Sequence, residues 1–205
     1  MSTLLPIAYF GNVEYFWHIA QDPSIQIDTG ETYQKQTYRN RCVVLGANGP
    51  LNLSVPVIRP NGQHTKTEEV MISEAENWRQ VHLKTLESCY NRTPYFEFYI
   101  DAIRVILETD YKYLHALTSA LTLHLVTKIG LVSSPVIGNF KPTESTLDLR
   151  DVLSPKKQSD FFGYNYIQTF TERYGFVNNL SILDLLFNEG PNSICIINES
   201  SCETK

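Results

Sequence analysis

The spacing of the apolar residues changes near residue 77, and this change limits the possible folds more than any other feature of the chain. Up to Ile72, short apolar runs alternate with turn-forming residues, a pattern typical of β-strands. From Asn77 to Gly130 the apolar residues recur at the spacing of helices that bury one face. Consecutive helices after several strands predict an α+β fold, a mixed sheet from the N-terminal strands packed against C-terminal helices.

Local signals place the expected elements. The first part of the chain predicts strands at 4–8, 25–28 and 67–72, a helix at 13–20, and a hairpin of 41–45 and 51–57 around Asn48-Gly49. The helical part predicts helices at 78–90 and 94–108 and a third that ends at Gly130, with Asn77, Thr93 and Asp110 as their caps. The remainder predicts an ordered connector or lid at 131–165, a strand at 164–170, and a helix at 181–187 capped by Asn179.

Length and charge limit the class of protein. A chain of 205 residues suits one domain, expected at 1–198 with a frayed tail at 199–205. The net charge of −5 argues against general binding of nucleic acid or anionic membranes. The chain shows neither a signal peptide nor an apolar run long enough to span a bilayer, so a cytoplasmic protein is expected. The cysteines have no zinc-site spacing, and neither a metal nor a cofactor is expected.

A basic and aromatic segment, YQKQTYRNR, stands out on this acidic background. Guanidinium groups bind carboxylates and phosphates through two parallel hydrogen bonds, which suits recognition of an anionic ligand. The alternative is a solvated turn before a strand. The candidate binding residues of this segment are Tyr33, Lys35, Tyr38, Arg39, Asn40 and Arg41.

Two histidines are candidates for proton transfer, because histidine titrates near neutral pH without help. His82 shares a helix face with Trp78, and its alternative role is that of a hydrogen-bonded core residue. His18 lies near the end of the first expected helix, where a structural role is again the alternative. Trp78 and Tyr9 are candidates for an apolar wall on which a sugar stacks.

Two further groups have alternative roles in the sequence. Cys42 follows Arg39 and Arg41, whose charge would favour a reactive thiolate, although a strand at this position would turn the thiol toward the core. Asp184 and Glu189 are close enough in sequence to form an acid/base pair, but surface carboxylates are the simpler expectation.

Several stretches together resemble the WbqC-like protein family. They are LLPIAYFGNVEYFWHIA at 4–20, YQKQTYRNR at 33–41, NGPLNLSVPV at 48–57, NWRQVHLKTLESCYNRTPYFEFY at 77–99 and NLSILDLLFNEGP at 179–191. The chain departs from the fuller family pattern at Leu5-Pro6-Ile7, where the family often has His-Gln-Pro. It also lacks the Gly-rich Lys-Gly-Ser segment and the Ser-Gly pair of longer members in 131–165.

The resemblance implies a place in bacterial surface-polysaccharide biosynthesis and the transfer of an amino-acid or acyl group to a sugar. Such a transferase would take a small-molecule sugar or acyl donor, with Arg39 and Arg41 holding its anionic group and His82 or His18 moving the proton. Two alternatives remain open from the sequence. One is a non-catalytic protein that binds anions or sugars, or acts in assembly, and the other is a thiol-dependent acyl carrier that uses Cys42. The sequence does not define the oligomeric state.

Overall fold

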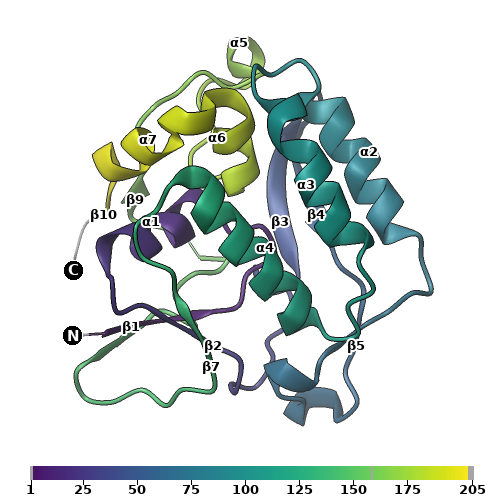
Figure 1. Cartoon of the computed structure of the whole chain (residues 1–205), viewed down its shortest axis with the longest axis vertical. Coiled ribbons are helices and arrows are strands. Elements are labelled where there is room, and N and C mark those ends of the chain that lie inside the picture. The colour runs from purple at the N-terminus through teal and green to yellow at the C-terminus, as the bar shows by residue number, and fades with distance from the viewer. Residues whose placement is uncertain (1, 158, 203–205) are drawn as a thin grey trace.

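The computed structural model describes residues 2–157 and 159–202 and has the expected α+β fold (Figure 1). Its helices are α1 (Val13–Gln21), α2 (Trp78–Tyr90), α3 (Phe96–Glu108), α4 (Leu114–Ile129), α5 (Thr171–Tyr174), α6 (Ile182–Glu189) and α7 (Ser193–Glu199). Its strands are β1 (Ser2–Pro6), β2 (Gln26–Asp28), β3 (Arg41–Gly46), β4 (Gly49–Ser54), β5 (Val57–Ile58), β6 (Met71–Ile72), β7 (Val136–Gly138), β8 (Thr146–Asp148), β9 (Phe161–Phe162) and β10 (Ser201–Cys202). Short 3-10 turns lie at Gly62–His64, Thr67–Glu69 and Gly190–Asn192.

The largest sheet has four strands in the order β7-β2-β1-β8, and all of them are parallel. This differs from one mixed sheet, because the antiparallel pairs β3-β4, β5-β6 and β9-β10 stand apart from it. Figure 1 shows the parallel sheet at the lower left, with α1 and α4 above it, and β3 between α6 and α2. Within this sheet β1 lies between β2 and β8. The connection that leaves β1 leads to β2 on one side, while β8 lies on its other side, so the direction of the connections changes between β1 and β8.

The predicted hairpin is confirmed as β3 paired with β4. The two strands end at the pair Gly46 and Gly49, and Gly49 has a φ of 106°, which glycine adopts without strain. The predicted strand at 67–72 is wrong in its first half. Residues 67–69 form a 3-10 turn in which Glu69 accepts from the Lys66 backbone N–H, and only β6 pairs with β5.

The predicted helix bodies are confirmed, but three of the predicted caps are wrong. Helix α3 begins after Tyr95 and not after Thr93, whose hydroxyl instead donates to the Tyr90 carbonyl. Helix α4 begins after Tyr113, because Tyr113 is extended and bridges to Met71 of β6. Helix α6 is capped by the Ser181 hydroxyl, which accepts from the Leu183 backbone N–H. Asn77 does precede α2, without a side-chain cap bond.

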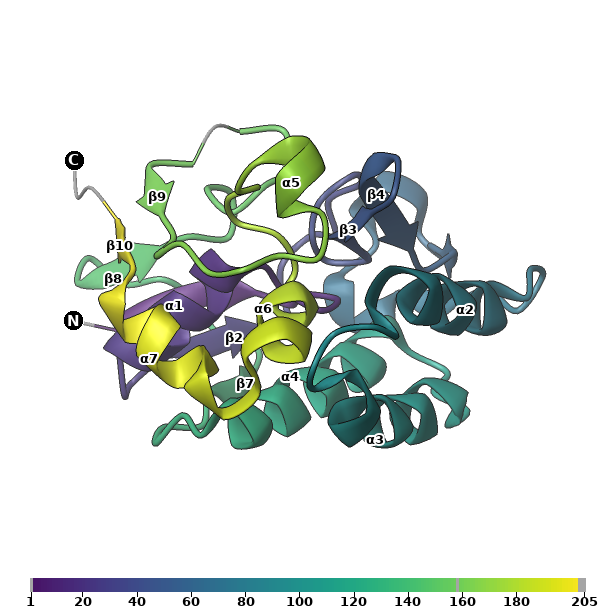
Figure 2. The same cartoon turned by 90° about the horizontal axis from the view of Figure 1, so that it is seen from above.

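The expected connector contributes two strands of the parallel sheet, β7 and β8. The strand expected at 164–170 is absent from the described residues, where the pairing is made by β9 with β10. Of the expected tail, Glu199 ends α7 and Ser201–Cys202 form β10, while 203–205 lie outside the described residues. Figure 2 shows β9 and β10 beside α1 and α7, with α2 and α3 at the other end of the molecule.

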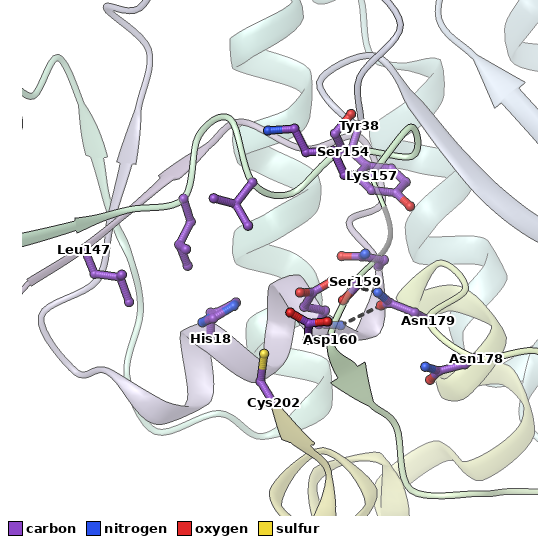
Figure 3. Close-up of a pocket in the computed structure, with 14 residues that line it drawn as sticks. His18, Tyr38, Leu147, Ser154, Lys157, Ser159, Asp160, Asn178, Asn179 and Cys202 are labelled. Atoms are coloured by element: carbon purple, nitrogen blue, oxygen red, sulfur yellow. Dashed lines mark hydrogen bonds between the residues drawn. The ribbon is translucent and has the colours of Figure 1, made fainter. Parts of the chain in front are cut away.

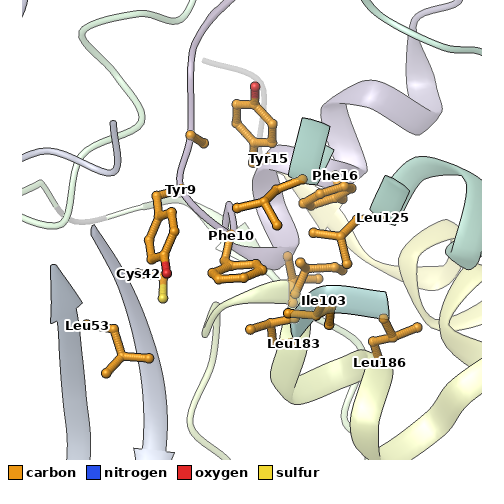
Figure 4. Close-up of a cluster of buried hydrophobic side chains, with 14 of the residues drawn as sticks. Tyr9, Phe10, Tyr15, Phe16, Cys42, Leu53, Ile103, Leu125, Leu183 and Leu186 are labelled. Atoms are coloured by element: carbon orange, nitrogen blue, oxygen red, sulfur yellow. The ribbon is translucent and has the colours of Figure 1, made fainter. Parts of the chain in front are cut away.

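The core lies where α1, α4 and α6 meet the first strands (Figure 4). Leu5, Phe10, Phe16, Leu125 and Leu183 are each at most 1% exposed there. Burial of such side chains contributes about 1.5–3 kcal/mol each. Among the described helices, none is long and apolar enough to cross a membrane.

Candidate functional site

A cavity of about 580 Å³ opens beside the carboxyl ends of β1 and β8. Ligands of open parallel sheets bind at this kind of position, where connections leave neighbouring strands in opposite directions. The lining residues come from the loop and helix after β1, from Tyr38 before β3, from β8 and the segment after it, from the chain before α6, and from β10 (Figure 3). They are Asn12, Glu14, His18, Tyr38, Leu147, Leu149, Val152, Ser154, Lys157, Ser159, Asp160, Asn178, Asn179 and Cys202.

Helix α1 places three side chains on this cavity. Asn12 caps the helix, and its Oδ1 accepts from the Tyr15 backbone N–H at 3.0 Å. Glu14 and His18 follow at positions four residues apart, so they lie on one face of the helix about 6 Å apart. The helix therefore presents a carboxylate and an imidazole to the same hollow.

Glu14 is buried at 5% exposure and is held by neutral groups. Asn179 Nδ2 donates to its Oε2 at 2.7 Å, and the side chains of Ser159 and Asn12 also form hydrogen bonds with it. Burial raises the pKa of Glu14, and the nearby charge of Asp160 raises it further, while the three hydrogen bonds lower it. Glu14 is thus a carboxyl group that can gain or lose a proton closer to neutral pH than an exposed one.

His18 and Tyr38 are the two predicted site residues that the structure brings together in the cavity. Burial lowers the pKa of His18 to about 4, so its imidazole is neutral near pH 7 but does not titrate near neutral pH as the sequence led us to expect. Tyr38 is half-buried, and burial raises the pKa of its phenol while a hydrogen bond with Asn12 lowers it. The phenol remains protonated and can donate to a ligand.

The opposite wall of the cavity carries polar and ionisable groups from the segment after β8 and from β10. Figure 3 shows the Cys202 sulfur directed between His18 and Asp160. Lys157 also lines the cavity, and its Nζ donates to the Asp151 carbonyl at 2.6 Å. The apolar part of the lining comes from β8 and the residues after it, including Leu147 and Val152.

Arg39 lies outside the lining of this cavity, in a buried ion pair. Its side chain is fully buried, and Nε and Nη2 each donate to Glu31 at 2.7 Å. Nη2 also donates to the Arg150 carbonyl at 3.1 Å. The anion that this guanidinium binds is therefore a carboxylate of the chain itself.

A second arginine extends this ionic network across the ends of the strands. Arg150 Nη1 donates to Asp28 at 2.6 Å, and Nη2 donates to Asp148 at 2.6 Å. Asp28 ends β2 and Asp148 ends β8, so Arg150 joins two strands that are not neighbours. The network ties the carboxyl ends of β2 and β8 together.

His82 lies in a separate buried cluster with Tyr9 and Trp78. Its Nδ1 and the Tyr9 hydroxyl share a hydrogen bond of 2.8 Å, and the Trp78 ring meets the imidazole edge-on at 5.2 Å between ring centroids. All three side chains are at most 3% exposed. Burial lowers the pKa of His82 to about 4, and a backbone hydrogen bond with Ser54 raises it. This arrangement is that of a hydrogen-bonded core histidine.

The other residues of the basic segment also lie outside the cavity lining. Tyr33 is buried, and burial raises its pKa to about 12. Lys35 is exposed, and Asn40 Nδ2 donates to the Val55 carbonyl at 2.8 Å. Arg41 opens β3 and is half-buried. Of the predicted segment, Tyr38 alone lines the cavity.

Two sequence expectations about ionisable groups need correction. Cys42 is 1% exposed, and burial raises the pKa of its thiol, so it is not a reactive surface nucleophile. Asp184 is not on the surface but fully buried. It accepts hydrogen bonds from Tyr90 at 2.9 Å, Tyr166 at 2.7 Å and Gln168 at 3.0 Å. This carboxylate binds α2, α6 and the chain before α5 together.

Glu14 and Asp160 were not among the site residues predicted from the sequence. Glu14 had one available signal, since it precedes the candidate His18 by four residues within the same expected helix. Asp160 had none, because it lies in a segment without periodicity whose place beside α1 depends on the pairing of β9 with β10.

Another hollow, of about 680 Å³, lies between α2 and residues 167–170. Arg92 and Gln168 are among its lining residues. Within the part of the chain that the structure describes, its lining contains no histidine and no carboxylate. The cavity beside α1 is therefore the better candidate for chemistry.

Comparison with known proteins gives one match. The model of the WbqC-like protein family matches residues 8–139, which is more than half of the chain. No curated protein and no solved structure matches the chain. The matched range includes the α1 wall of the cavity and Tyr38, while the opposite wall lies beyond it.

Proposed function

The chain belongs to the WbqC-like protein family, and from this membership and the geometry of the cavity we propose that it transfers an acyl or aminoacyl group to a sugar. The reaction would take place in the cytoplasm, in the biosynthesis of a bacterial surface polysaccharide. The single observation that carries the proposal is that Glu14 and His18 face one cavity at the carboxyl ends of β1 and β8.

Each side chain has a role that its surroundings support. His18 is neutral near pH 7 and accepts the proton of the sugar nucleophile as the new bond forms. Tyr38 donates a hydrogen bond that orients the sugar, and the apolar residues Leu147 and Val152 meet its less polar face. Lys157, at the same cavity, supplies the positive charge for an anionic group of the donor.

The basic segment has a supporting role in this proposal. Arg39 is fully buried on Glu31, and a donor that displaced Glu31 would leave a buried carboxylate unpaired. The position of Tyr38 in the cavity depends on this neighbour, because the buried ion pair anchors the chain next to it.

A transfer assay tests the proposal. The protein is incubated with an acyl thioester and a panel of sugar nucleotides, and mass spectrometry detects the acylated sugar. We expect His18→Gln to lower the rate by about a hundredfold or more, the usual size of a general-base effect. His64→Gln is the matched control, because His64 is exposed and does not line the cavity.

The same assay separates the alternative of a non-catalytic sugar- or anion-binding protein. Binding of a sugar nucleotide that depends on Tyr38, without any acylated product across the panel, would favour that alternative. Equal rates for the wild-type protein and His18→Gln would remove His18 from the mechanism.

A further inference from the structure

Three arginines lie near the phenol of Tyr33, outside the lining of the cavity beside α1. Burial raises the pKa of Tyr33, while three nearby guanidinium charges lower it, those of Arg39, Arg41 and Arg59. Tyr33 is 5% exposed, and its hydroxyl forms no hydrogen bond within the part of the chain that the structure describes. The chain as a whole has a net charge of −5, so this place is locally cationic on an acidic protein.

The backbone explains why residues distant in sequence meet at this place. The Tyr33 backbone N–H donates to the Thr65 carbonyl at 2.9 Å. The Thr65 hydroxyl in turn accepts from the Asn61 backbone N–H at 3.0 Å, within the turn that follows Arg59. Arg41 comes from the start of β3, where it pairs with the last residue of β4. Two separate loops and a strand therefore bring their side chains to one phenol.

The arginines of this cluster have donors that no described residue accepts. Arg41 is half-buried, and its Nε is buried without a hydrogen-bond partner. Arg39 binds Glu31 through Nε and Nη2 and leaves Nη1 buried without a partner. Among the described residues, Arg41 and Arg59 form no ion pair. Cationic donors withdrawn from water are costly when unpaired, so an anion that accepts from them would be bound favourably.

The carboxylates of the surrounding segments are engaged elsewhere. Glu31 is held by Arg39. Glu69 accepts from the Lys66 backbone N–H at 3.0 Å and from Asn61 Nδ2 at 3.2 Å. The charges of Arg41 and Arg59 are therefore left for a group that the chain itself does not supply.

We propose that Tyr33, Arg41 and Arg59 bind a phosphate group. Guanidinium groups match phosphate oxygens through parallel hydrogen bonds, and the phenol of Tyr33 adds a neutral donor. A phosphate with two negative charges balances two unpaired guanidinium groups, whereas a carboxylate would balance only one. Arg39 adds positive charge from its place on Glu31.

This phosphate site is distinct from the site of the proposed transfer. Tyr33, Arg41 and Arg59 do not line the cavity beside α1, whose cation is Lys157. The inference therefore goes beyond the proposed function and does not depend on it. A transfer assay without product would leave the phosphate site standing, and an absent phosphate site would leave the roles of His18 and the cavity unchanged.

Titration calorimetry with matched ligands tests the inference. Inorganic phosphate, glucose 1-phosphate and glucose are titrated into the full chain slightly above neutral pH, with chloride keeping the ionic strength constant. We expect both phosphates to bind and glucose not to bind at this site. Arg41→Gln and Arg59→Gln should each weaken phosphate binding by about tenfold or more, the size expected for loss of a hydrogen bond between charged groups.

The two phosphates also separate the possible sources of the group. Tighter binding of glucose 1-phosphate than of inorganic phosphate would support the site as one for a phosphorylated small molecule. Equal binding of the two would support it as a site for free phosphate.

Matched variants control for general charge and for folding. Arg104→Gln removes an exposed arginine of α3 and should leave phosphate binding unchanged. Tyr33→Phe should weaken binding less than the loss of an arginine, because it removes a neutral donor. Thermal unfolding without phosphate establishes that each variant is folded, and Arg59→Gln carries the test if the half-buried Arg41 variant does not fold.

Three results would overturn the inference. One is the absence of phosphate binding to the wild-type protein, or binding that persists undiminished in Arg41→Gln and Arg59→Gln. Another is an equal loss in Arg104→Gln, which would indicate general attraction by charge. The third is binding that is lost in Lys157→Gln and kept in Arg59→Gln, because the phosphate would then lie in the cavity beside α1.

Discussion

Asn179 binds Glu14 through both ends of its amide, across 165 positions of the chain. One oxygen accepts from the Glu14 backbone N–H at 3.0 Å, and Nδ2 donates to the Glu14 carboxylate at 2.7 Å. Asn179 adopts a φ of 60°, a left-handed conformation that asparagine tolerates better than most residues. This contact joins the start of α1 to the chain before α6 and forms one wall of the cavity.

Replacing Asn179 therefore tests two effects that can be separated. Asn179→Ala loses both hydrogen bonds and strains the backbone, and should lower the free energy of unfolding by about 2–4 kcal/mol. Asn179→Gly loses the bonds but keeps the conformation accessible, and should cost about 1–2 kcal/mol less than the alanine variant. Urea denaturation measures both. Equal stabilities of the two variants would contradict a conformational role of this asparagine.

The buried pair of Arg39 and Glu31 predicts a stability effect rather than a binding effect. Arg39→Met leaves Glu31 buried without its partner and should lower the free energy of unfolding by about 3–5 kcal/mol. The double variant with Glu31→Leu should recover most of this loss, because both charges are then gone. Urea denaturation of the two variants makes the comparison. If the double variant folds and keeps the Tyr38 contacts but binds no sugar, Arg39 would again have to be regarded as a ligand-binding residue.

Asp184 predicts a different pattern, because all of its partners are donors without charge. Asp184→Ala removes the acceptor of the Tyr90 and Tyr166 hydroxyls and one of the acceptors of Gln168, and should cost about 3 kcal/mol or more. Glu189→Gln, on the same helix, should change stability by less than about 0.5 kcal/mol. Thermal unfolding of the two variants provides the test. Similar melting temperatures would show that the Asp184 bonds do not hold the chain before α5 to α2.

The sign of the Asp184 pH effect follows from its environment. Burial raises the pKa of this carboxyl above its value in the unfolded chain. Its contribution to stability is then full below the unfolded pKa and declines as the pH rises through the folded pKa. Asp184→Asn should remove that decline, as urea denaturation at several pH values will measure.

His82 predicts a loss of stability in mild acid. Its pKa is lowered to about 4 in the folded protein, while an unperturbed histidine titrates near 6.5. Between these values the unfolded chain binds more protons, so its stabilising contribution is present above the unfolded pKa and is lost as the pH falls. A shift of this size corresponds to about 3 kcal/mol. His82→Phe should flatten the slope in urea titrations between pH values near 6.5 and 4, and an unchanged slope would argue against a buried neutral imidazole.

The sequence identified α1, α2, α3, α4 and α6 because their apolar spacing is regular, but it missed the short helices α5 and α7. It missed β7 and β8, which have three residues each and expose Val136 and Leu147, so no alternating pattern marks them. Helix starts were less predictable, since Tyr113, just before α4, bridges to Met71 of β6 in the folded protein. A cap signal in sequence cannot compete with such a tertiary contact.

The site was only partly predicted, because contacts between distant parts of the chain also decide which side chains meet there. The sequence singled out Tyr38 and His18, but it could not show that one cavity joins them. The charge of Arg39 was visible, whereas its partner Glu31 depends on how the chain turns between β2 and β3. Glu14 was hidden because a carboxylate in the first turn of a helix is normally a surface group.

The most direct test of the central claim is the NMR response of the five histidine side chains to a sugar ligand. The imidazole signals of the wild-type protein are assigned with His18→Gln and His82→Phe and followed during titration with a sugar nucleotide. Because His18 lines the cavity and His82 is buried against Tyr9, we expect the His18 signal to shift while that of His82 stays in place. A shift of the His82 signal with His18 unchanged would contradict the assignment of the cavity beside α1 as the functional site.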